Sequence, residues 1–473
     1  MLILPTSYEN AVESLYALGH ELANTSSEHF NLAYMRAILR EMGDPHRRFS
    51  SVLIAGTNGK GSTAATLASI LRAAGHRTGL YSSPHLLRVN ERIRVNGEEI
   101  GEERFGDIHQ RVEAVARRLV EAGELPWHPS FFEVLTAMAF DYFAAGGVEI
   151  AVLEVGMGGR LDATNVVEPV VSVITDIALD HQKFLGDTIA QIAREKAGII
   201  RPGGVVVTLP QHPEANDVIG NAIAEREAHA VSAVPYVPPV APGAKDVPGV
   251  APNGLSPQHT KTGLAEDPGV RTSYPLRVMG EEIIVDSPLV GRHQLRNIAL
   301  AIATAEQLNC AGIRVTARDI DRGIRETRWP GRFQRIAATS GSPEIILDVA
   351  HNPAGAWALR AALSEYAGER PLVVVFGVMR DKAVGEIADI LFPRADYVIA
   401  TRAENPRSAS PGEIQAAALR TGAEVIVEPT VTAALARARE LTPAGGIVVI
   451  TGSIYVVGEA LSEIGTSSDR VIG

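Results

Sequence analysis

Short apolar runs that alternate with helical patterns recur through most of the 473 residues of this chain. The runs lack the apolar–polar alternation of a strand with one exposed face, so both of their faces are expected to be covered. Such strands, separated by helices, predict βαβ units and parallel-rich, doubly wound sheets of the α/β class. The eight candidate strands are residues 52–55, 150–154, 170–175, 205–209, 345–349, 372–376, 397–401 and 447–451.

A proline-rich segment interrupts this series in the middle of the chain. Residues 234–274 hold eight prolines and little apolar periodicity, which is typical of a loop or an inserted surface segment. No function is assigned to it. The sequence "LRVMGEEIIVDS" that follows predicts a β-hairpin turning near Met279 and Gly280.

A second interruption, "TRWPGRF" at residues 327–333, predicts a domain boundary. Pro330 and Gly331 end the preceding helical pattern, and a new strand–helix series begins beyond them. We therefore expect a larger N-terminal domain at residues 1–328 and a smaller α/β domain at residues 329–473.

Charge and cysteine content limit the partners and the compartment. The formal net charge is −11, which argues against general nucleic-acid binding because that function needs a basic face. The single cysteine, Cys310, excludes an intrachain disulfide and fits a reducing compartment. The N-terminus lacks a signal-peptide pattern, and no stretch approaches the roughly 18 apolar residues of a membrane span. We expect a cytoplasmic protein with no nucleic-acid or membrane partner.

The stretch "GTNGKGST" at residues 56–63 lies between a candidate strand and an amphipathic helical pattern. Strand, glycine-rich turn and helix start together predict a phosphate site, because free backbone N–H groups and the helix dipole face the anion. Lys60 would reach the β- and γ-phosphates of a nucleotide, and Ser62 or Thr63 would offer a hydroxyl to Mg²⁺. Residues 56–63 are named the phosphate loop (P-loop) below.

The phosphate loop departs from the usual pattern, G-x-x-x-x-G-K-[ST], at two positions. Ile54 stands where the first glycine is expected, and Gly61 follows the lysine. The loop alone does not identify a reaction, since kinases, switch GTPases, motors and ligases all use one. The N-K-x-D motif that reads a guanine base is absent from the sequence, which disfavours a guanine-specific switch.

Acidic, histidine and lysine residues follow two further strands. Glu154 ends the strand at 150–154, and ligands gather at this end of strands in an open α/β sheet. Its carboxylate suits Mg²⁺, although a helix-capping role is equally compatible with the pattern. His181 follows the strand at 170–175, where a structural role is the commoner one. Lys196, after "RE" in a helical pattern, has the pattern of a solvated surface charge.

Eight motifs occur in order between residues 56 and 459: "GTNGKGS", "SSPHLLRVNERIRVNG", "GGRLDATNVV", "DHQKFLGDTIAQIAREKAGI", "GRHQLRNIALA", "PGRF", "AHNP" and "TGSIYVVGE". Together they resemble folylpolyglutamate synthase and dihydrofolate synthase, of the Mur ligase superfamily. The resemblance implies a P-loop ATPase domain and a smaller Rossmann-like C-terminal domain, with ATP bound between them. It also implies an amide bond formed between L-glutamate and either dihydropteroate or the terminal glutamate of a folate.

The resemblance implies substrate contacts at individual positions. Nucleotide contacts are expected at Thr57, Asn58, Gly59, Lys60, Gly61, Ser62, Thr63, Asn297, Arg332, Asp348 and His351. Pterin contacts are expected at Phe131, Phe132 and Asp162. Val349 stands where the family more often has a glycine, next to Asp348.

The resemblance also implies two Mg²⁺ ions and a catalytic set of Lys60, Glu154, His181 and Lys196. Lys60 contacts the phosphates, Ser62 binds the first ion as a metal ligand, Glu154 lies near or bridges both, and His181 binds the second. Lys196 matches the family's carbamylated lysine. Carbamylation converts a cation into an anion and makes an oxygen ligand suited to Mg²⁺.

The expected chemistry begins with transfer of the γ-phosphoryl group of ATP to the acceptor carboxylate, since a free carboxylate does not react with an amine. The amine of glutamate then attacks the acyl phosphate, and phosphate leaves. Because water would hydrolyse the acyl phosphate, we expect the two domains to close about a hinge near residues 328–331.

Several alternatives remain open to the sequence. One is a monofunctional folylpolyglutamate synthase in place of the expected bifunctional, monomeric enzyme. Another is a cell-wall ligase, which usually has an extra N-terminal domain; the about 50 residues before the phosphate loop are too few for one. A P-loop kinase leaves the "AHNP" motif without a role. The last is a nucleotide-gated binding module that does not ligate.

Overall fold

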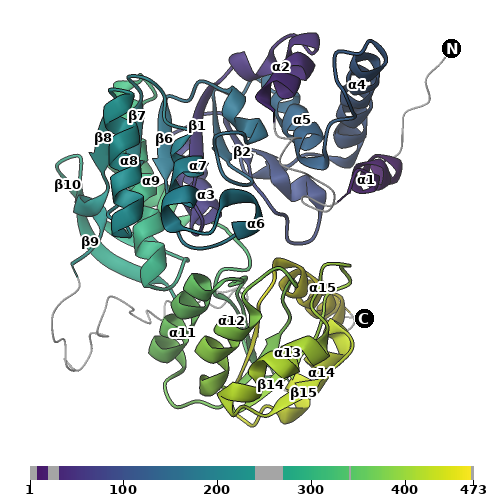
Figure 1. Cartoon of the computed structure of the whole chain (residues 1–473). Coiled ribbons are helices and arrows are strands. Elements are labelled where there is room, and N and C mark those ends of the chain that lie inside the picture. The colour runs from purple at the N-terminus through teal and green to yellow at the C-terminus, as the bar shows by residue number, and fades with distance from the viewer. Residues whose placement is uncertain (1–7, 20–30, 240–269, 340–341, 470–473) are drawn as a thin grey trace. The chain divides into compact units, whose positions relative to one another are not determined.

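The computed structural model describes residues 8–19, 31–239, 270–339 and 342–469, which form two compact units (Figure 1). Unit 1 comprises the described residues of Met1–Pro238, Pro275–Ile284 and Arg296–Thr327, and unit 2 those of Pro239–Tyr274, Val285–Leu295 and Arg328–Gly473. The chain therefore passes from unit 2 back into unit 1 between Leu295 and Arg296, and leaves unit 1 after Thr327.

Unit 1 is built on an eight-stranded sheet in the order β4-β3-β2-β5-β1-β6-β7-β8. Its strands are β1 Ser50–Ala55, β2 Thr78–Tyr81, β3 Ile93–Val95, β4 Glu98–Glu99, β5 Ile150–Glu154, β6 Val171–Ile174, β7 Val205–Thr208 and β8 His229–Ser232. Within this order, the six strands β2, β5, β1, β6, β7 and β8 pair parallel, whereas the β2–β3 and β3–β4 pairs at one edge are antiparallel. The central position of β1, between β5 and β6, brings the loops that follow these three strands to one edge of the sheet.

Helices cover both faces of this sheet. The helices of unit 1 are α1 Tyr8–Ala17, α2 Leu32–Glu41, α3 Lys60–Ala73, α4 Glu102–Glu121, α5 Phe131–Ala145, α6 Gln182–Leu185, α7 Ile189–Ala197, α8 Pro213–Glu225 and α10 Ala317–Arg325, with α9 Arg292–Cys310 shared with unit 2. Short 3₁₀ turns lie at Pro45–Arg47, Val89–Arg92, Ala163–Val166 and Val234–Tyr236. Leu53 and Ala55 of β1 belong to a core formed with α1, α2, α4, α5, α7 and α8. The alternate residues Val52 and Ile54 are equally buried, on the other face.

The α3 and α10 helices pack against each other especially closely. A Cβ on Gly323 of α10 would lie 2.3 Å from Cα of Ile70 in α3. Since α3 also contacts β1, β2 and β5, this packing holds the helix that begins at the phosphate loop against the sheet.

Unit 2 repeats the architecture on a smaller scale. Its sheet has the order β11-β12-β16-β13-β14-β15, parallel except for the β11–β12 pair. The strands are β11 Gln334–Ile336, β12 Glu344–Leu347, β13 Leu372–Phe376, β14 Tyr397–Ala400, β15 Val425–Val427 and β16 Ile447–Thr451, and the helices are α11 Pro353–Ala367, α12 Val384–Leu391, α13 Pro411–Ala418, α14 Val431–Leu441 and α15 Ile454–Asp469. Short 3₁₀ turns lie at Phe392–Arg394 and Leu419–Thr421. The α11, α12 and α13 helices share one core with the sheet, while α14 contacts β13 and α15 contacts β16.

The expected hairpin is confirmed. Strands β9 Thr272–Val278 and β10 Glu281–Ser287 form a two-stranded sheet. Met279 and Gly280 between them have φ of 51° and 84°, which is the backbone that a tight two-residue hairpin turn requires. The proline-rich segment ends earlier than expected, because Thr272–Tyr274 belong to β9, and its first residues, Val234–Tyr236, form a short 3₁₀ turn. Its residues 240–269 lie outside the described part of the chain.

The α/β class and all eight candidate strands are confirmed, each within two residues of its expected ends. The strands that sequence patterns did not indicate are β2, β3, β4, β8, β11 and β15, which have between two and four residues each. Runs this short carry too little periodicity to be distinguished from a loop. Within residues 8–19, 31–239, 270–339 and 342–469, no helix is both long and apolar enough to cross a membrane.

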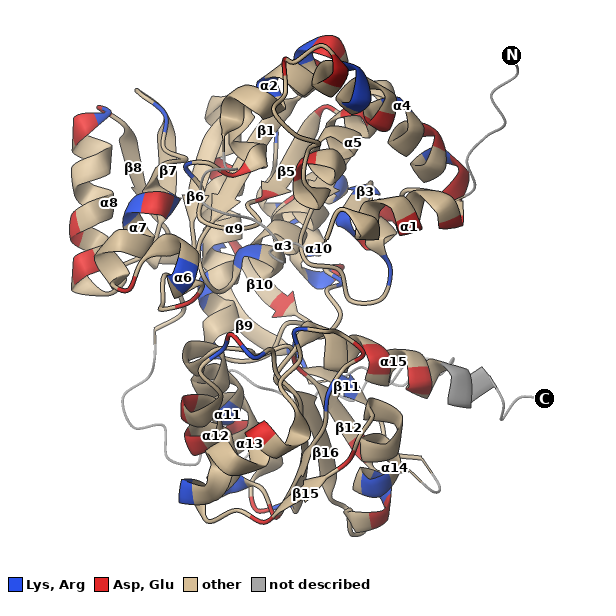
Figure 2. Cartoon of the chain, turned by 45° about the vertical axis from the view of Figure 1, so that its right-hand side comes forward, with Lys and Arg blue, Asp and Glu red and all other residues tan. Residues whose placement is uncertain are grey.

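One ion pair joins α4 to the loop that leads into α5. The α4 helix carries acidic and basic residues along its length (Figure 2), and Glu113 Oε2 lies 3.0 Å from His128 Nε2. The hydrogen bond from His128 lowers the pKa of Glu113 to about 2. The same bond raises the pKa of His128 above its usual value. Arg117 and His109 also face Glu113 and favour its charged form.

The pair predicts a pH-dependent contribution to stability. Because the pKa of His128 is raised in the folded state, its contribution is present below the unfolded pKa of about 6.5 and is lost as pH rises through the folded value. The contribution of Glu113, whose pKa is lowered, is lost only in acid, as pH falls below about 4.5. We expect His128→Gln to lower Tm at a pH of about 6 and to have little effect at about 9. An equal loss of Tm at both values would show that the pair does not act through charge.

Candidate functional site

The phosphate loop begins directly after the central strand of unit 1. Gly56 to Gly59 connect β1 to α3, which starts at Lys60 and runs for 14 residues. Gly56 and Gly59 have φ of 155° and 91°. A Cβ at Gly56 would lie 1.8 Å from Oγ1 of Thr175, and one at Gly59 would lie 2.1 Å from Oδ1 of Asn297. Both positions therefore require glycine, by conformation and by space.

The loop is hydrogen-bonded to the segment that follows β6. The backbone N–H groups of Thr57 and Asn58 both donate to the carbonyl of Asp176, at 2.9 and 3.1 Å. The Thr57 hydroxyl donates to the carbonyl of Ala178 at 3.0 Å and accepts from its N–H at 3.1 Å. Thr57 and Asn58, expected as nucleotide contacts, therefore also hold the loop to its neighbour.

Two lysines converge on the backbone of this loop. Nζ of Lys60 donates to the carbonyl of Thr57 at 3.2 Å, and Nζ of Lys196 on α7 donates to the carbonyl of Gly56 at 2.8 Å. Lys196 is buried, with 4% of its surface exposed. The pattern-based assignment of Lys196 to the solvated surface is therefore wrong, and the reason is tertiary: the face of α7 that carries Lys196 is turned toward the loop after β1, where Nζ reaches Gly56.

Burial changes the protonation of Lys196. Loss of hydration and, to a lesser extent, the charge of Lys60 lower its pKa to about 7, against the opposing effects of Asp180 and Asp162. At neutral pH a substantial fraction of this amine is therefore unprotonated. A neutral amine is the nucleophile that adds CO₂, whereas an ordinary surface lysine is almost fully protonated.

Glu154 and Asp162 are both buried carboxylates near the ends of strands, but their surroundings differ. Glu154 ends β5, is 4% exposed, and accepts a hydrogen bond from the N–H of Ser83 at 3.2 Å. Asp162 accepts from the N–H groups of Met157 and Thr164, at 3.1 and 3.0 Å, and from the Thr164 hydroxyl. Burial raises the pKa of Asp162, although these hydrogen bonds oppose the shift. Asp162 thus organises the glycine-rich loop after β5.

The donors expected for Mg²⁺ include oxygen atoms from two buried residues. Ser62 lies in the first turn of α3 and is 2% exposed, and Glu154 supplies a carboxylate. His181 has a left-handed φ of 51° and its N–H donates to Asp180 Oδ1 at 2.8 Å. A hydroxyl and a carboxylate suit Mg²⁺, whereas the amine of Lys196 would be a ligand only as a carbamate. No group of three or more His, Cys, Asp or Glu side chains in the described segments could hold a metal ion, so the expected set depends on Ser62 and on a modified Lys196.

The two phenylalanines expected at the pterin site have different surroundings. Phe131 is buried in the main core, stacked on Tyr16 at 5.7 Å between ring centroids, with the guanidinium of Arg92 5.2 Å from its ring. Phe132 is only partly buried. Its ring lies 2.6 Å from the position of a Cβ on Gly156. Phe132 is thus the more accessible of the two, beside the glycine-rich loop after β5.

In unit 2, Asp348 follows β12 and joins two loops. Its carboxylate accepts from the N–H of Phe333 at 2.9 Å and from the N–H of Ala350 at 2.9 Å. The "PGRF" and "AHNP" segments, which hold Arg332 and His351, are thereby held side by side within this unit.

Neighbouring backbone contacts add to this arrangement. The N–H of Val349 donates to the carbonyl of Gly331 at 3.0 Å, and Nδ1 of His351 lies 2.9 Å from the carbonyl of Val349. Val349 is not among the described residues with a positive φ. The backbone here therefore accepts a β-branched residue where the family more often has glycine.

Comparison with known proteins decides the family. Residues 331–454 match the family described as "Mur ligase, glutamate ligase domain". The dihydrofolate synthase/folylpolyglutamate synthase of Bacillus subtilis is 32% identical over 437 residues, which cover 90% of this chain and 93% of that protein. The chain belongs to the folylpolyglutamate synthase/dihydrofolate synthase family of Mur ligases.

Two further relatives extend this finding. The solved folylpolyglutamate synthase of Mycobacterium tuberculosis, complexed with ADP and AMPPCP, matches with a TM-score of 0.79 and 32% identity, over 96% of this chain and 99% of that one. The "probable bifunctional folylpolyglutamate synthase/dihydropteroate synthase" of Haloferax volcanii is 34% identical over 461 residues, or 96% of this chain. This chain spans 50% of the length of that archaeal protein.

Sequence reasoning missed several residues of this folylpolyglutamate synthase-like site. Asp176, Asp180, Ser83 and Arg296 all contact residues of the expected set or their loops. Asp176 and Asp180 both lie within six residues of the end of β6. Their position after a strand was therefore a usable signal for a site residue. Arg296 had no signal of its own, because an arginine within a helix is ordinarily solvated.

Gly59 allows a direct test of the loop geometry. Gly59→Ala combines a left-handed φ with contact against Asn297, whereas Gly75→Ala, at the other end of α3, has a similar φ of 89° and nothing within 4 Å. Left-handed strain of about 1–3 kcal/mol is common to both variants, so the difference between them measures the contact. We expect Gly59→Ala to weaken binding of a fluorescent ATP analogue by about 10-fold or more and Gly75→Ala to leave it unchanged. Equal affinities in the two variants would contradict the geometry.

Proposed function

We propose that this chain is an ATP-dependent ligase that forms an amide bond between L-glutamate and the carboxylate of dihydropteroate or of a folate. The observation that carries the proposal is the phosphate loop with a buried lysine of lowered pKa hydrogen-bonded to its backbone. The names of the relatives from B. subtilis and M. tuberculosis support the substrate class, and the ADP and AMPPCP in the latter structure support the nucleotide.

In the proposed reaction the phosphate loop binds and orients the triphosphate. Backbone N–H groups at Gly59, Lys60 and Gly61 and the N-terminus of α3 face the phosphates. The Lys60 ammonium stabilises the charge that develops as the γ-phosphoryl group moves to the acceptor carboxylate. The amine of glutamate then attacks the carbonyl carbon, the C–N bond forms, and phosphate leaves with the C–O electron pair.

We propose that two Mg²⁺ ions are held by Ser62, Glu154, His181 and Lys196. When bound, they supply positive charge beside the transferring phosphoryl group. The neutral amine of Lys196 would attack CO₂, forming a C–N bond and releasing one proton to solvent, which leaves a carbamate anion. This exchange replaces a second positive charge near Lys60 with a negative one and supplies oxygen donors.

We propose further nucleotide contacts from Thr63, Asn297, Arg332, Asp348 and His351. The hydrogen bonds from Asp348 to two loops favour a positioning role for its carboxylate. Phe132 and, less directly, Phe131 and Asp162 are proposed for the pterin. The domains at residues 1–328 and 329–473 are proposed as the two working parts of a monomeric, cytoplasmic enzyme.

The name of the B. subtilis relative includes both synthase activities, and we propose both for this chain. A monofunctional folylpolyglutamate synthase is the alternative. Purified protein with ATP and glutamate should release phosphate with dihydropteroate and, separately, with a reduced folate. Phosphate release with the folate alone would favour the alternative.

Lys60→Ala tests the phosphate loop. We expect kcat to fall by about 10²-fold or more, because the charge on the transferring group loses its main cation, while Tm stays close to that of the unaltered protein. Lys183→Ala, on the exposed start of α6, is the matched control and should retain activity. Undiminished ligation by Lys60→Ala would overturn the assignment of the loop.

Lys196 is tested by its carbamate. In protein equilibrated with ¹³C-bicarbonate, we expect one carbamate resonance in the ¹³C NMR spectrum that is absent from Lys196→Ala and present in Lys183→Ala. The Lys196→Ala variant should also lose ligation while keeping its fold by circular dichroism. A spectrum without the resonance in protein that ligates at full rate would rule the carbamate out.

A further inference from the structure

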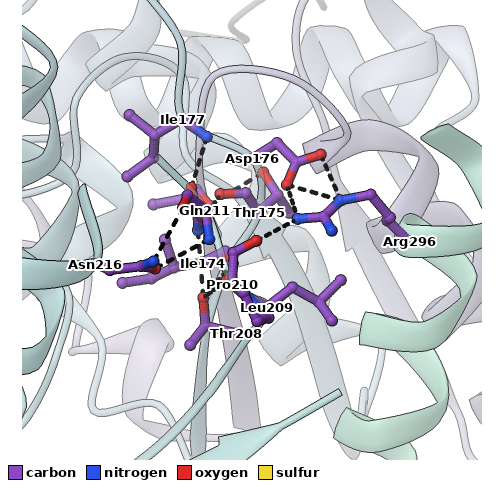
Figure 3. A network of polar contacts seen from close by, with 11 residues as sticks. Ile174, Thr175, Asp176, Ile177, Thr208, Leu209, Pro210, Gln211, Asn216 and Arg296 are labelled. Carbon is purple, nitrogen blue, oxygen red and sulfur yellow. Dashed lines mark hydrogen bonds and ion pairs between the residues drawn. The ribbon is translucent and has the colours of Figure 1, made fainter. Parts of the chain in front are cut away.

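An ion pair connects the segment after β6 with the α9 helix, within unit 1 (Figure 3). Nε of Arg296 lies 3.1 and 3.0 Å from the two carboxylate oxygens of Asp176, and Nη2 lies 2.5 Å from Oδ1. The guanidinium thus binds both carboxylate oxygens, a geometry that fixes orientation as well as distance. The two side chains are 31% and 35% exposed.

Asp176 is also the residue that holds the start of the phosphate loop. Its backbone carbonyl accepts the N–H groups of Thr57 and Asn58. One residue therefore presents its carbonyl to the loop and its carboxylate to Arg296.

Arg296 in turn precedes the residue that contacts the other end of the loop. Asn297 Oδ1 lies 2.1 Å from the position of a Cβ on Gly59. The carbonyl of Asn297 accepts a hydrogen bond of 3.4 Å from the Thr63 hydroxyl, in the first turn of α3. The pair thus joins the two structural elements between which the phosphate loop is held.

The loop after β7 also contacts the ion pair and the residues that flank Asp176 (Figure 3). Nη2 of Arg296 donates to the carbonyl of Pro210 at 2.9 Å. The side chain of Gln211 accepts from the N–H of Ile177 at 2.8 Å and donates to the carbonyl of Thr175 at 3.1 Å. The residues on both sides of Asp176 are therefore held, and the carboxylate has little freedom to move away from Arg296.

We propose that the Asp176–Arg296 pair positions the phosphate loop. The pair fixes the loop relative to Asn297, and Arg296 neutralises the Asp176 carboxylate beside the phosphate site. Neither side chain need touch the nucleotide. This inference rests on the proposed function, because it takes the phosphate loop as the ATP site.

Stability alone does not explain the pair. Partly exposed ion pairs contribute little to the free energy of unfolding. A carboxylate whose own backbone is bonded to the loop would, however, repel an anionic triphosphate if Arg296 were absent. The expected defect therefore lies in ATP binding and in the alignment of the loop rather than in Tm.

Four variants distinguish a role in ATP binding from a role in stability alone. Arg296→Gln removes the cation and leaves the carboxylate unpaired, whereas Asp176→Asn removes the carboxylate. The double variant removes both charges, and Arg296→Lys keeps the charge without the two-pronged geometry. Arg72→Gln is the matched control: Arg72 lies near the far end of α3, and its pair with Glu326 is 37% and 46% exposed.

We expect Arg296→Gln to raise KM for ATP by about 10-fold or more, since small displacements at a reacting group are costly, while KM for glutamate is unchanged. Arg296→Lys should recover part of this loss because the lysine pairs with the Asp176 carboxylate. The double variant should also recover part of it, because it no longer carries that carboxylate. All Tm shifts should resemble that of Arg72→Gln, which should keep the KM for ATP of the unaltered protein.

An unchanged KM for ATP in Arg296→Gln, or a double variant with the summed defects of the single ones, would overturn the inference. So would a loss of activity that follows Tm across the series. The Lys60→Ala variant distinguishes a failure of the underlying assignment. If Lys60→Ala ligates normally, the phosphate loop is not the ATP site; if it fails while Arg296→Gln is normal, only the positioning role is wrong.

Discussion

The turn from β1 into α3 is the constraint on which the rest of the site depends. Its backbone has no room for side chains at Gly56 or Gly59, where Thr175 and Asn297 lie in contact range. A loop this closely surrounded cannot relax independently of its neighbours, so its backbone N–H groups are held in fixed orientations by them. The contacts that surround it come from residues more than a hundred positions away in the chain.

The same closeness accounts for the chemistry of Lys196. Its amine is hydrogen-bonded to the carbonyl of Gly56 and removed from water. The desolvated ammonium, with Lys60 nearby, loses much of its preference for the charged form. Burial and the nearby cation thus act in the same direction on this amine.

In both units an aspartate near the end of a strand holds neighbouring segments in place. Each has a parallel sheet covered by helices on both faces, and each presents loops at the carboxyl ends of its strands. In unit 1 the carbonyl of Asp176 accepts from the phosphate loop, and its carboxylate pairs with Arg296 on the α9 helix. In unit 2 the carboxylate of Asp348 accepts N–H groups from two segments. A buried or half-buried aspartate beside a strand end is in both cases a means of fixing loops that have no regular structure.

The sequence by itself determined the α/β class, the eight main strands and the phosphate loop, because buried parallel strands are continuously apolar and a strand–glycine–helix turn leaves a local signature. It did not show that Lys196 is buried or that Asp176 and Arg296 are paired. Nor did it show that Asp162 accepts a hydrogen bond from Thr164 and that Phe131 stacks on Tyr16. Those facts depend on which helix face packs on the sheet and on contacts between residues about 120 positions apart. Local patterns do not encode such contacts, since they arise only when the sheet brings the loops after β1, β6 and β7 together.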